Sequence, residues 1–354
     1  MIGPSTHCHV LVDRKTNRLG AVQGEILAFA TCRNERLRLP AFLTHYRSLG
    51  VDRFFIVDND SSDGTVEYLA EQVDVQLFGT ANRYSEARSG AVWLDALLGE
   101  FGVGRWCVTA DIDELLVYPG SEYASLRTLT RYLDHHGYEA LACMLLDLYP
   151  AGPLKECRYE TGDDLFAAAP YFDAGPYDRS PSDFCPGVLI RGGMRERIFY
   201  PEFRARGLAS KIYDAILDGV AYRAPLLRET SWLRARQRRN PPCLTKVPLI
   251  RWDKKSTRVN NHWVSAKIVA PETGALLHFK FLHDFHDRAI QEVARSEHYD
   301  GATEYQRYAD TLRENPDLTL TYEGSMRFEG TTQLVRLGLM HETNAWADAS
   351  IRSR

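Results

Sequence analysis

The chain has 354 residues, of which 44% are hydrophobic and 25% charged, a composition typical of a globular protein rather than a disordered or fibrous one. Its net charge of −4 argues against a dedicated nucleic-acid binder, because such proteins carry an overall basic face. Seven cysteines without a Cys-x-x-Cys pair indicate reduced thiols in a cytoplasmic protein. No stretch approaches the ~20 consecutive apolar residues of a membrane span, so we expect at most peripheral contact with the inner membrane face.

The amino-terminal third alternates strand-like and helix-like patterns. Short apolar runs predict buried strands at residues 25–32, 54–57, 73–78 and 106–112. Helical patterns separate these runs: one between Glu35 and Gly50, a short one from Val66, and one over 86–101. This alternation is typical of a parallel sheet, whose strands bring their carboxyl ends to one edge.

The strongest chemical signal is Asp111-Ile112-Asp113-Glu114, which follows the fourth predicted strand. Asn34 and Asp58 follow the first two strands, so we expect them at the same edge of the sheet. A hard cation such as Mg²⁺ or Mn²⁺ prefers one or two carboxylates together with substrate phosphate oxygens. The alternative is that Asp111 or Asp113 caps a helix while Glu114 is solvated.

The middle of the chain is less regular. After a helix within 123–136 and a buried strand over 139–149, residues 150–186 are rich in Gly, Pro and Asp and predict a long surface loop. A strand at 187–190 then leads into Gly192-Gly193, beside which Arg195 and Arg197 could hold phosphate or acceptor charge. The alternative is that Gly192-Gly193 forms a structural turn and that Arg195 and Arg197 are solvated.

Two basic or imidazole-bearing segments follow. The basic run at 234–239 is either a solvated helical face or a contact to anionic lipid or a phosphorylated acceptor. Residues 265–281 predict two strands joined by a turn at 271–274. Strand alternation places His278 and Lys280 on one face, which fits a site for a metal and a diphosphate, although a core histidine is the alternative.

The glycine-rich signatures of the common nucleotide-binding folds do not occur in this sequence. No Gly-x-Gly-x-x-Gly follows the first strand, and no Gly-Lys-Ser/Thr loop is present to hold a triphosphate. The phosphates of a bound nucleotide would therefore be neutralised chiefly by a metal and by cationic side chains.

Six motifs in this order resemble those of the GT-A fold glycosyltransferases, in particular the soluble, family-2-like bacterial group. The resemblance covers about residues 24–340. Its motifs are Cys-Arg-Asn-Glu at 32–35, Phe-Phe-Ile-Val-Asp-Asn-Asp-Ser-Ser-Asp-Gly-Thr at 54–65, Asp-Ile-Asp-Glu at 111–114, Gly-Gly-Met-Arg-Glu-Arg-Ile-Phe at 192–199, Lys-Val-Pro-Leu at 246–249 and Leu-Leu-His-Phe-Lys-Phe at 276–281.

This resemblance implies a fold and a domain layout. The expected fold is α/β, a Rossmann-like mixed sheet of the GT-A type flanked by helices, with a C-terminal helical segment. A flexible lead would occupy residues 1–23, the catalytic domain 24–282, and a helical extension packed on it 283–354.

The resemblance also implies an activity: metal-dependent transfer of a sugar from a nucleoside-diphosphate donor to a hydroxyl of a glycan or glycolipid acceptor, with inversion. Mn²⁺ or Mg²⁺ would be the cofactor, held by Asp111, Asp113 and His278. The residues expected to bind the donor nucleotide are Arg33, Asn34, Glu35, Asp58, Asn59, Asp111, Lys246 and Lys280. Arg195 and Arg197 would meet the acceptor or a phosphate.

The general base is the least determined role, because the paired Glu-Asp common in this family is not evident. Glu196 is the first candidate and Asp183 the second. Two other functions stay open. A sugar-phosphate nucleotidyltransferase would share the sheet and acidic site but normally carries a glycine-rich loop near the first strand, and a non-catalytic carbohydrate-binding relative need not keep the metal residues.

Overall fold

The computed structural model describes residues 11–14, 22–182, 187–223, 239–258, 260, 262, 264–265 and 267–352. Asp183, the second candidate base, lies outside the described residues. So do most of the basic run at 234–239 and most of the expected N-terminal lead.

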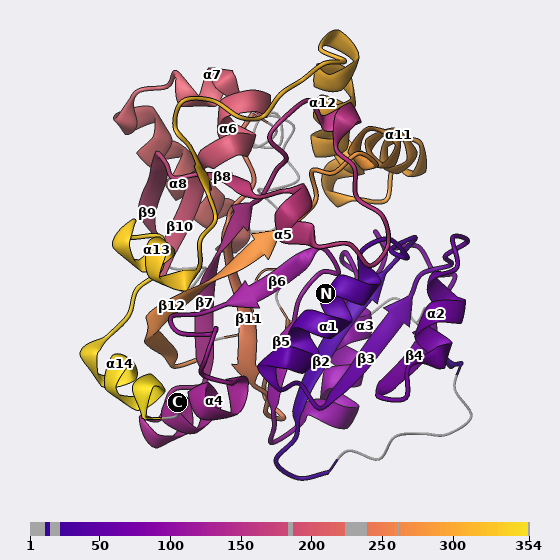
Figure 1. Cartoon of the computed structure of the whole chain (residues 1–354), viewed down its shortest axis with the longest axis vertical. Coiled ribbons are helices and arrows are strands. Elements are labelled where there is room, and N and C mark those ends of the chain that lie inside the picture. Colours follow the sequence, from indigo (N-terminus) through magenta and orange to yellow (C-terminus); the bar gives the residue numbers. More distant parts are fainter. Residues whose placement is uncertain are drawn as a thin grey trace.

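Helices cover both faces of one large mixed sheet (Figure 1). Within the described part of the chain this sheet has nine strands in the order β1-β4-β3-β2-β5-β11-β7-β12-β6. Its strands are β1 (Val12–Asp13), β2 (Ile26–Cys32), β3 (Arg53–Asp58), β4 (Val75–Gly79), β5 (Trp106–Thr109), β6 (Glu114–Val117), β7 (Ala140–Asp147), β11 (Thr245–Arg251) and β12 (Val269–His278). The α/β fold class with a Rossmann-like mixed sheet is thereby confirmed.

The other elements of the described residues are helices, short helical turns and two small antiparallel strand pairs. The helices are α1 (Leu39–Leu49), α2 (Thr65–Glu71), α3 (Ala91–Leu97), α4 (Leu126–His135), α5 (Leu165–Ala168), α6 (Gly193–Phe199), α7 (Pro201–Arg204), α8 (Leu208–Arg223), α11 (Phe285–Arg295), α12 (Tyr299–Glu314), α13 (Thr331–Arg336) and α14 (Asn344–Ile351). A π-helical turn spans Leu98–Gly102 and a 3₁₀ turn Leu154–Glu156. Two further antiparallel pairs are β9 (Tyr177–Ser182) with β10 (Gly187–Gly192) and β8 (Tyr171–Asp173) with β13 (Ser325–Arg327).

The four predicted parallel strands form one half of the sheet, where β4, β3, β2 and β5 lie side by side and run the same way. Side chains of β2 alternate between two cores: Ala28 belongs to the cluster that contains α1, and Phe29 to the cluster that contains α3. Helices therefore bury both faces, which explains why these strands read as continuous apolar runs. Gly50 ends α1 in the left-handed conformation at φ 97°, as its sequence position predicts.

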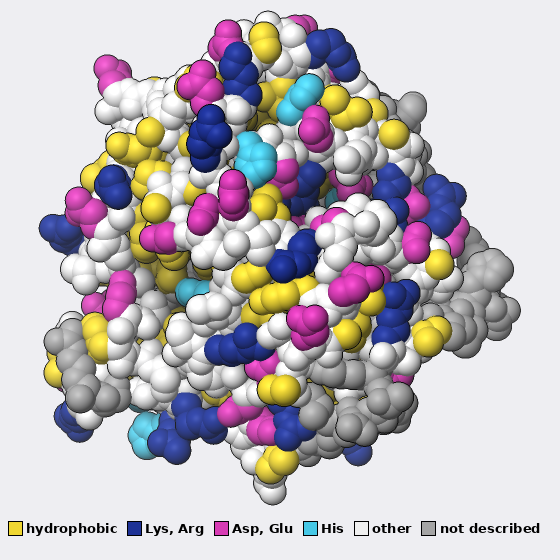
Figure 2. Space-filling model, turned by 45° about the vertical axis from the view of Figure 1, so that its right-hand side comes forward, with side chains coloured by type: hydrophobic (Ala, Val, Ile, Leu, Met, Phe, Trp, Pro, Cys, Tyr) yellow, Lys and Arg dark blue, Asp and Glu magenta, His cyan; other side chains and the backbone are white. Residues whose placement is uncertain are grey.

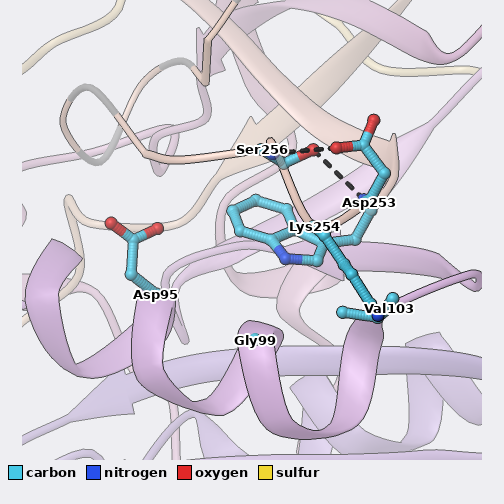
Figure 3. A pocket seen from close by; sticks show the side chains of 7 residues that line it. Asp95, Gly99, Val103, Asp253, Lys254 and Ser256 are labelled. Carbon is cyan, nitrogen blue, oxygen red and sulfur yellow. Dashed lines mark hydrogen bonds between the residues drawn. The ribbon is translucent and has the colours of Figure 1, made fainter.

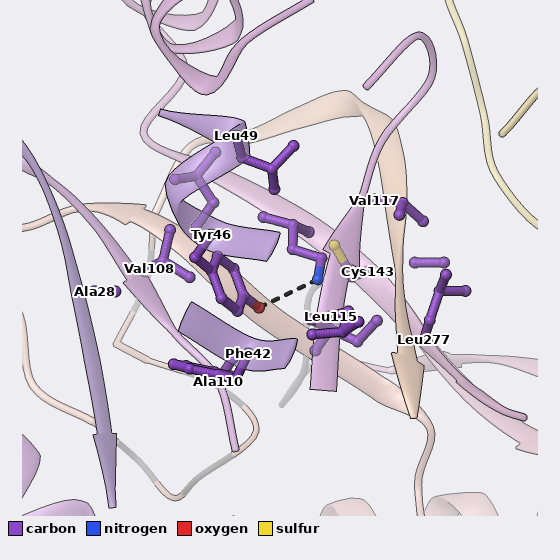
Figure 4. Close-up of a cluster of buried hydrophobic side chains, with 14 of the residues drawn as sticks. Ala28, Phe42, Tyr46, Leu49, Val108, Ala110, Leu115, Val117, Cys143 and Leu277 are labelled. Atoms are coloured by element: carbon purple, nitrogen blue, oxygen red, sulfur yellow. Dashed lines mark hydrogen bonds between the residues drawn. The ribbon is translucent and has the colours of Figure 1, made fainter. Parts of the chain in front are cut away.

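The other half of the sheet is mixed and contains a strand that the sequence did not predict. Immediately after Asp113 the chain enters β6, which pairs antiparallel with β12. The Tyr46 hydroxyl of α1 fixes this strand: it donates to the Glu114 carbonyl at 3.0 Å and accepts from the Leu116 amide at 3.2 Å. Figure 4 shows Tyr46 among buried apolar side chains, with a dashed line that marks a hydrogen bond of its hydroxyl. The packing of α1 thus places the residues that follow Asp113.

Two predictions for the second half are wrong. Residues 265–281 do not form a hairpin: β12 continues through 271–274, where its register with β7 shifts as in a β-bulge. Glu272 in this bulge is buried and accepts a hydrogen bond from the Tyr132 hydroxyl at 2.7 Å, so a turn-like sequence serves an interior strand. Residues 150–186 are not simply a loop either, since they contain α5, β8 and β9.

The C-terminal part is largely helical, and α11 packs against α12. Phe281 and Phe285 meet Tyr308 of α12 and Phe199 of α6 in a third aromatic core. No helix in the described ranges is long and apolar enough to cross a membrane. On the face that Figure 2 shows, Lys and Arg side chains are interspersed with Asp and Glu.

Candidate functional site

Three strands bring His278 next to two carboxylates. His278 is the last residue of β12, and its register partners are Asp147 on β7 and Glu114 on β6. Asp113 directly precedes β6, and its carbonyl accepts from the Phe279 amide at 2.8 Å. The sheet therefore converges on one buried acidic centre, with 5–8% of each of Asp113, Asp147 and His278 exposed.

The two ring nitrogens of His278 have different carboxylate partners. Nδ1 lies 2.6 Å from Asp147 Oδ1 and Nε2 lies 3.3 Å from Asp113 Oδ2. Arg195 binds both oxygens of Asp147, with Nε donating to Oδ2 at 2.9 Å and Nη2 to Oδ1 at 2.7 Å. Arg195 Nη2 also lies 2.7 Å from Nδ1, but a nitrogen that donates its proton to Asp147 does not accept one from arginine.

Electrostatics tie Asp113 and His278 together. Burial lowers the pKa of His278, but Asp113 and Asp147 outweigh it and the pKa is raised. Burial likewise raises the pKa of Asp113, but His278 and two arginines hold it well below the usual value. Asp113 and His278 thus each favour the charged form of the other.

The residues present fit a divalent cation. A metal-bound histidine usually donates its other ring N–H to a carboxylate, and Asp147 is in that position toward Nδ1. Asp113 Oδ2 and His278 Nε2, 3.3 Å apart, face each other as two ligands of one ion could. Among the described residues, Asp113, Glu114 and His278 form a group whose ligand atoms lie within 4.8 Å of one another.

The first aspartate of the motif belongs to a neighbouring ion cluster. Lys246 of β11 is buried and donates to Asp111 Oδ2 at 2.9 Å and to Glu114 Oε1. The Asp111 amide donates to the other Glu114 oxygen at 3.1 Å. Lys246 therefore neutralises Glu114, while the Asp111 side chain stays 40% exposed at the edge of the sheet.

The predicted donor residues at the ends of β2 and β3 lie together in a hydrogen-bonded pair of loops. Asn34, at φ 52°, accepts from the Ser62 amide at 2.8 Å, and Arg33 donates to the Asn59 carbonyl at 2.7 Å. Asn59 is buried and donates to the carbonyls of two residues in the next loop, at 3.1 and 3.0 Å. Asp58 is fully buried, 3.7 Å from Arg14.

Arginine–carboxylate pairs join helix α11, and Asp284 just before it, to the segment that follows β2. Arg288 makes two contacts to Glu35, one of them at 3.2 Å. Arg38 is fully buried and binds both oxygens of Asp284, at 2.7 and 2.6 Å. Burial raises the pKa of Glu35, although Arg288 and Arg38 act to lower it. The charge of Asp113 adds to the rise, so Glu35 lies within electrostatic reach of the acidic centre.

The remaining predicted residues lie around this centre with partners of their own. Arg197 donates to both oxygens of Asp173 at 2.9 and 3.0 Å, and the Lys280 ammonium lies 4.3 Å from the Tyr305 ring centre. Lys280 has a lowered pKa because burial outweighs the nearby carboxylates.

Glu196 is buried on α6, where Oε1 is 3.5 Å from Lys211 and Oε2 has no hydrogen-bond partner within the described structure. Burial raises its pKa, against Lys211, which lowers it. Its role as a base stays a prediction.

Sequence reasoning missed Asp147 and the arginines Arg38 and Arg288. Asp147 had a signal: it is the one charged residue in the apolar run 140–149, and a carboxylate in a buried strand requires a partner. The pairings of Arg38 with Asp284 and of Arg288 with Glu35 join residues about 250 positions apart, and no local pattern carries that information.

Comparisons with known proteins give little more. No protein-family model matches the sequence, and no curated protein matches it. Among solved structures, a 4-diphosphocytidyl-2C-methyl-D-erythritol synthase aligns at 15% identity and a TM-score of 0.24, over 40% of this chain and 67% of that one. A glucose-1-phosphate thymidylyltransferase of Bacillus anthracis, in complex with a sucrose, aligns at 11% identity and a TM-score of 0.24, over 38% and 61%. We base no conclusion about this chain on likenesses of this size.

Proposed function

We propose that this chain is a metal-dependent transferase of nucleotide-activated sugars, and that it moves the sugar to a hydroxyl of a glycan or glycolipid acceptor as GT-A glycosyltransferases do. The single observation that carries this proposal is the Asp113–His278 pair, 3.3 Å apart at the carboxyl edge of the parallel strands, with Asp147 behind the imidazole. Open α/β sheets bind ligands at that edge.

In this proposal Asp113 and His278 hold Mn²⁺ or Mg²⁺, and Asp147 orients the imidazole so that Nε2 faces the ion. When bound, the cation stabilises the negative charge that develops on the departing diphosphate. The acceptor oxygen forms a bond to the anomeric carbon while the bond from that carbon to the diphosphate oxygen breaks. The electron pair leaves with the nucleoside diphosphate, and the acceptor proton passes to a carboxylate, for which Glu196 is the first candidate.

The second candidate is nucleotidyl transfer to a sugar phosphate, which would use the same sheet and the same acidic site. That reaction needs donors for a nucleoside triphosphate near the first strand. Three consecutive backbone amides there are already hydrogen-bonded: Asn34 to Ser61 Oγ at 2.9 Å, and the next two, at 35 and 36, to Thr65 Oγ1 and Asp63 Oδ2 at 3.0 Å. Because these amides have side-chain partners, we favour glycosyl transfer.

The two reactions release different products, which makes them separable. We would incubate the protein with nucleotide sugars and Mn²⁺, and separately with nucleoside triphosphates and sugar 1-phosphates. Glycosyl transfer or donor hydrolysis releases a nucleoside diphosphate, and nucleotidyl transfer releases pyrophosphate.

The matched variants are Asp113→Asn and Asp60→Asn, since the Asp60 side chain is 70% exposed at the same edge. We expect nucleoside diphosphate release that Asp113→Asn abolishes and Asp60→Asn retains. Pyrophosphate release alone would favour the second candidate, and equal activity in both variants would contradict the metal role of Asp113.

A further inference from the structure

The segment between β11 and β12 contains a buried arginine that the proposed reaction has not used. Arg258 is 2% exposed, yet its Nε and Nη1 atoms have no hydrogen-bond partner within the described structure. An arginine keeps its charge in proteins, so it cannot relieve this state by losing a proton. Buried donors without a hydrogen-bond partner are costly and therefore rare in folded proteins.

Carboxylates of α3 and of the acidic edge lie within electrostatic reach of Arg258. Its backbone amide donates to Asp95 Oδ1 at 2.8 Å, which anchors the residue on α3. Burial lowers the pKa of the guanidinium, and Asp95, Asp111, Tyr84 and Glu114 act against that lowering without cancelling it.

The nearby carboxylates already have cationic partners. Lys246 binds both Asp111 and Glu114, and Arg88 lies 3.4 Å from Asp95. Arg258 therefore adds positive charge beside the acidic edge without hydrogen-bonding to any of these groups through Nε or Nη1.

A hollow of about 400 Å³ nearby does not account for this arginine. Asp95, Gly99, Val103, Trp252, Asp253, Lys254 and Ser256 line it (Figure 3). Gly99 and Val103 precede β5, so the hollow opens beside the start of that strand, whereas Asp111 follows its end. Arg258 is not among the lining residues. A ligand bound in this hollow would therefore not supply the missing partners of Nε and Nη1.

We propose that Arg258 is an anion-binding residue of the donor site, which donates from Nε and Nη1 to phosphoryl oxygens of the donor diphosphate. Guanidinium N–H groups form charge-assisted hydrogen bonds with phosphate oxygens, which are among the stronger hydrogen bonds. Nε and Nη1 point to different sides of the guanidinium, so they would donate to different phosphoryl oxygens. This inference rests on the proposed function, because it assigns the ligand to the same edge as Asp113. Both nitrogens are covered in this conformation, so the arginine side chain rotates when it binds the ligand.

The experiment measures binding of inorganic pyrophosphate and of nucleoside di- and monophosphates to the whole chain in the presence of Mn²⁺, by calorimetry. The variants are Arg258→Met and Arg258→Lys. The matched control is Arg251→Gln, which removes an arginine of the same part of the chain whose partner is Asp134 at 2.9 Å on the surface. We expect Arg258→Met to bind pyrophosphate about 10- to 100-fold more weakly, Arg258→Lys to recover part of that loss, and Arg251→Gln to bind normally.

Thermal unfolding of the ligand-free variants separates a binding role from a structural one. Because Nε and Nη1 contribute no hydrogen bond to the fold, Arg258→Met should have an unchanged or higher melting temperature. Normal pyrophosphate binding by Arg258→Met, or a lower melting temperature without ligand, would overturn the inference and leave the proposed function standing. If the wild-type chain bound neither pyrophosphate nor any nucleotide, both the inference and the proposed function would be overturned. If it bound pyrophosphate but no nucleotide, and Arg258→Met lost that binding, the inference would be supported and the nucleotide-sugar function contradicted.

Discussion

Replacing Asp147 with asparagine should weaken metal binding through His278 without touching a metal ligand. The substitution removes the charge that accepts from His278 Nδ1 at 2.6 Å and from Arg195 at 2.9 and 2.7 Å. Loss of such a carboxylate behind a metal-binding histidine typically costs 10- to 100-fold in affinity, or about 1.4–2.8 kcal/mol. Breaking the buried pair with Arg195 should also lower the free energy of unfolding, by roughly 3 kcal/mol.

The fold effect and the metal effect can be separated with a matched variant. Asp173 is a second buried carboxylate that accepts from two nitrogens of an arginine, Nε and Nη2 of Arg197, at 2.9 and 3.0 Å. Asp173→Asn should lose a similar amount of stability in urea denaturation but keep its Mn²⁺ affinity, measured by titration against the electron paramagnetic resonance signal of free Mn²⁺. If both variants were destabilised and both bound Mn²⁺ normally, Asp147 would be a purely structural residue and our reasoning would be refuted.

Three further predictions concern catalysis, pH and packing. Glu196→Gln should lower kcat about 10²-fold with donor affinity unchanged. Glu202→Gln, on the neighbouring α7, should leave kcat unchanged. A normal rate for Glu196→Gln in single-turnover assays would exclude Glu196 as the general base. Burial lowers the pKa of His45 to about 4, against its hydrogen bond to the Leu116 carbonyl, so the folded state binds fewer protons than the unfolded one below pH 6.5. Stability should therefore fall from pH 6.5 toward 4, by at most about 1.4 kcal/mol per pH unit for this group, and His45→Gln should flatten that slope in urea titrations; identical slopes would contradict the assignment. Gly274→Ala should destabilise the fold by about 1–3 kcal/mol, because its Cβ would lie 2.6 Å from the Val117 carbonyl oxygen, while Gly99→Ala, with open space around it, should be neutral or stabilising in the same thermal scan.

The parallel half of the sheet was predictable because its signals are local. Each of its strands is a largely apolar run followed by polar residues, and Pro40 and Gly50 mark the two ends of α1. The approach of Asp113 to His278 was predictable only through the resemblance, since 165 residues separate them in the sequence and pairing of β6 with β12 brings them together.

The predictions for the second half of the sheet were wrong where tertiary contacts outweigh the local preference of the sequence. Residues 271–274 have the composition of a turn, but the buried Glu272 has hydrogen-bond partners in Tyr132 and Thr343. The absence of a side chain at Gly274 lets β12 lie between β6 and β7. A local pattern cannot show that a polar residue will be satisfied by a distant helix.

The helix expected from residue 86 begins only at Ala91. Arg88, Ser89 and Gly90 all have positive φ, a backbone conformation that interrupts a helix. The apolar pattern of the segment gives no sign of this interruption.

The most direct test of the account is where a bound cation lies. We would determine the crystal structure of the protein with Mn²⁺ and a nucleoside diphosphate and locate the metal from its anomalous scattering. The account predicts a peak about 2.1 Å from both an Asp113 carboxylate oxygen and His278 Nε2, with the diphosphate on its open side. A diphosphate bound at this edge with no anomalous peak between Asp113 and His278, or with the peak at other residues, would contradict it.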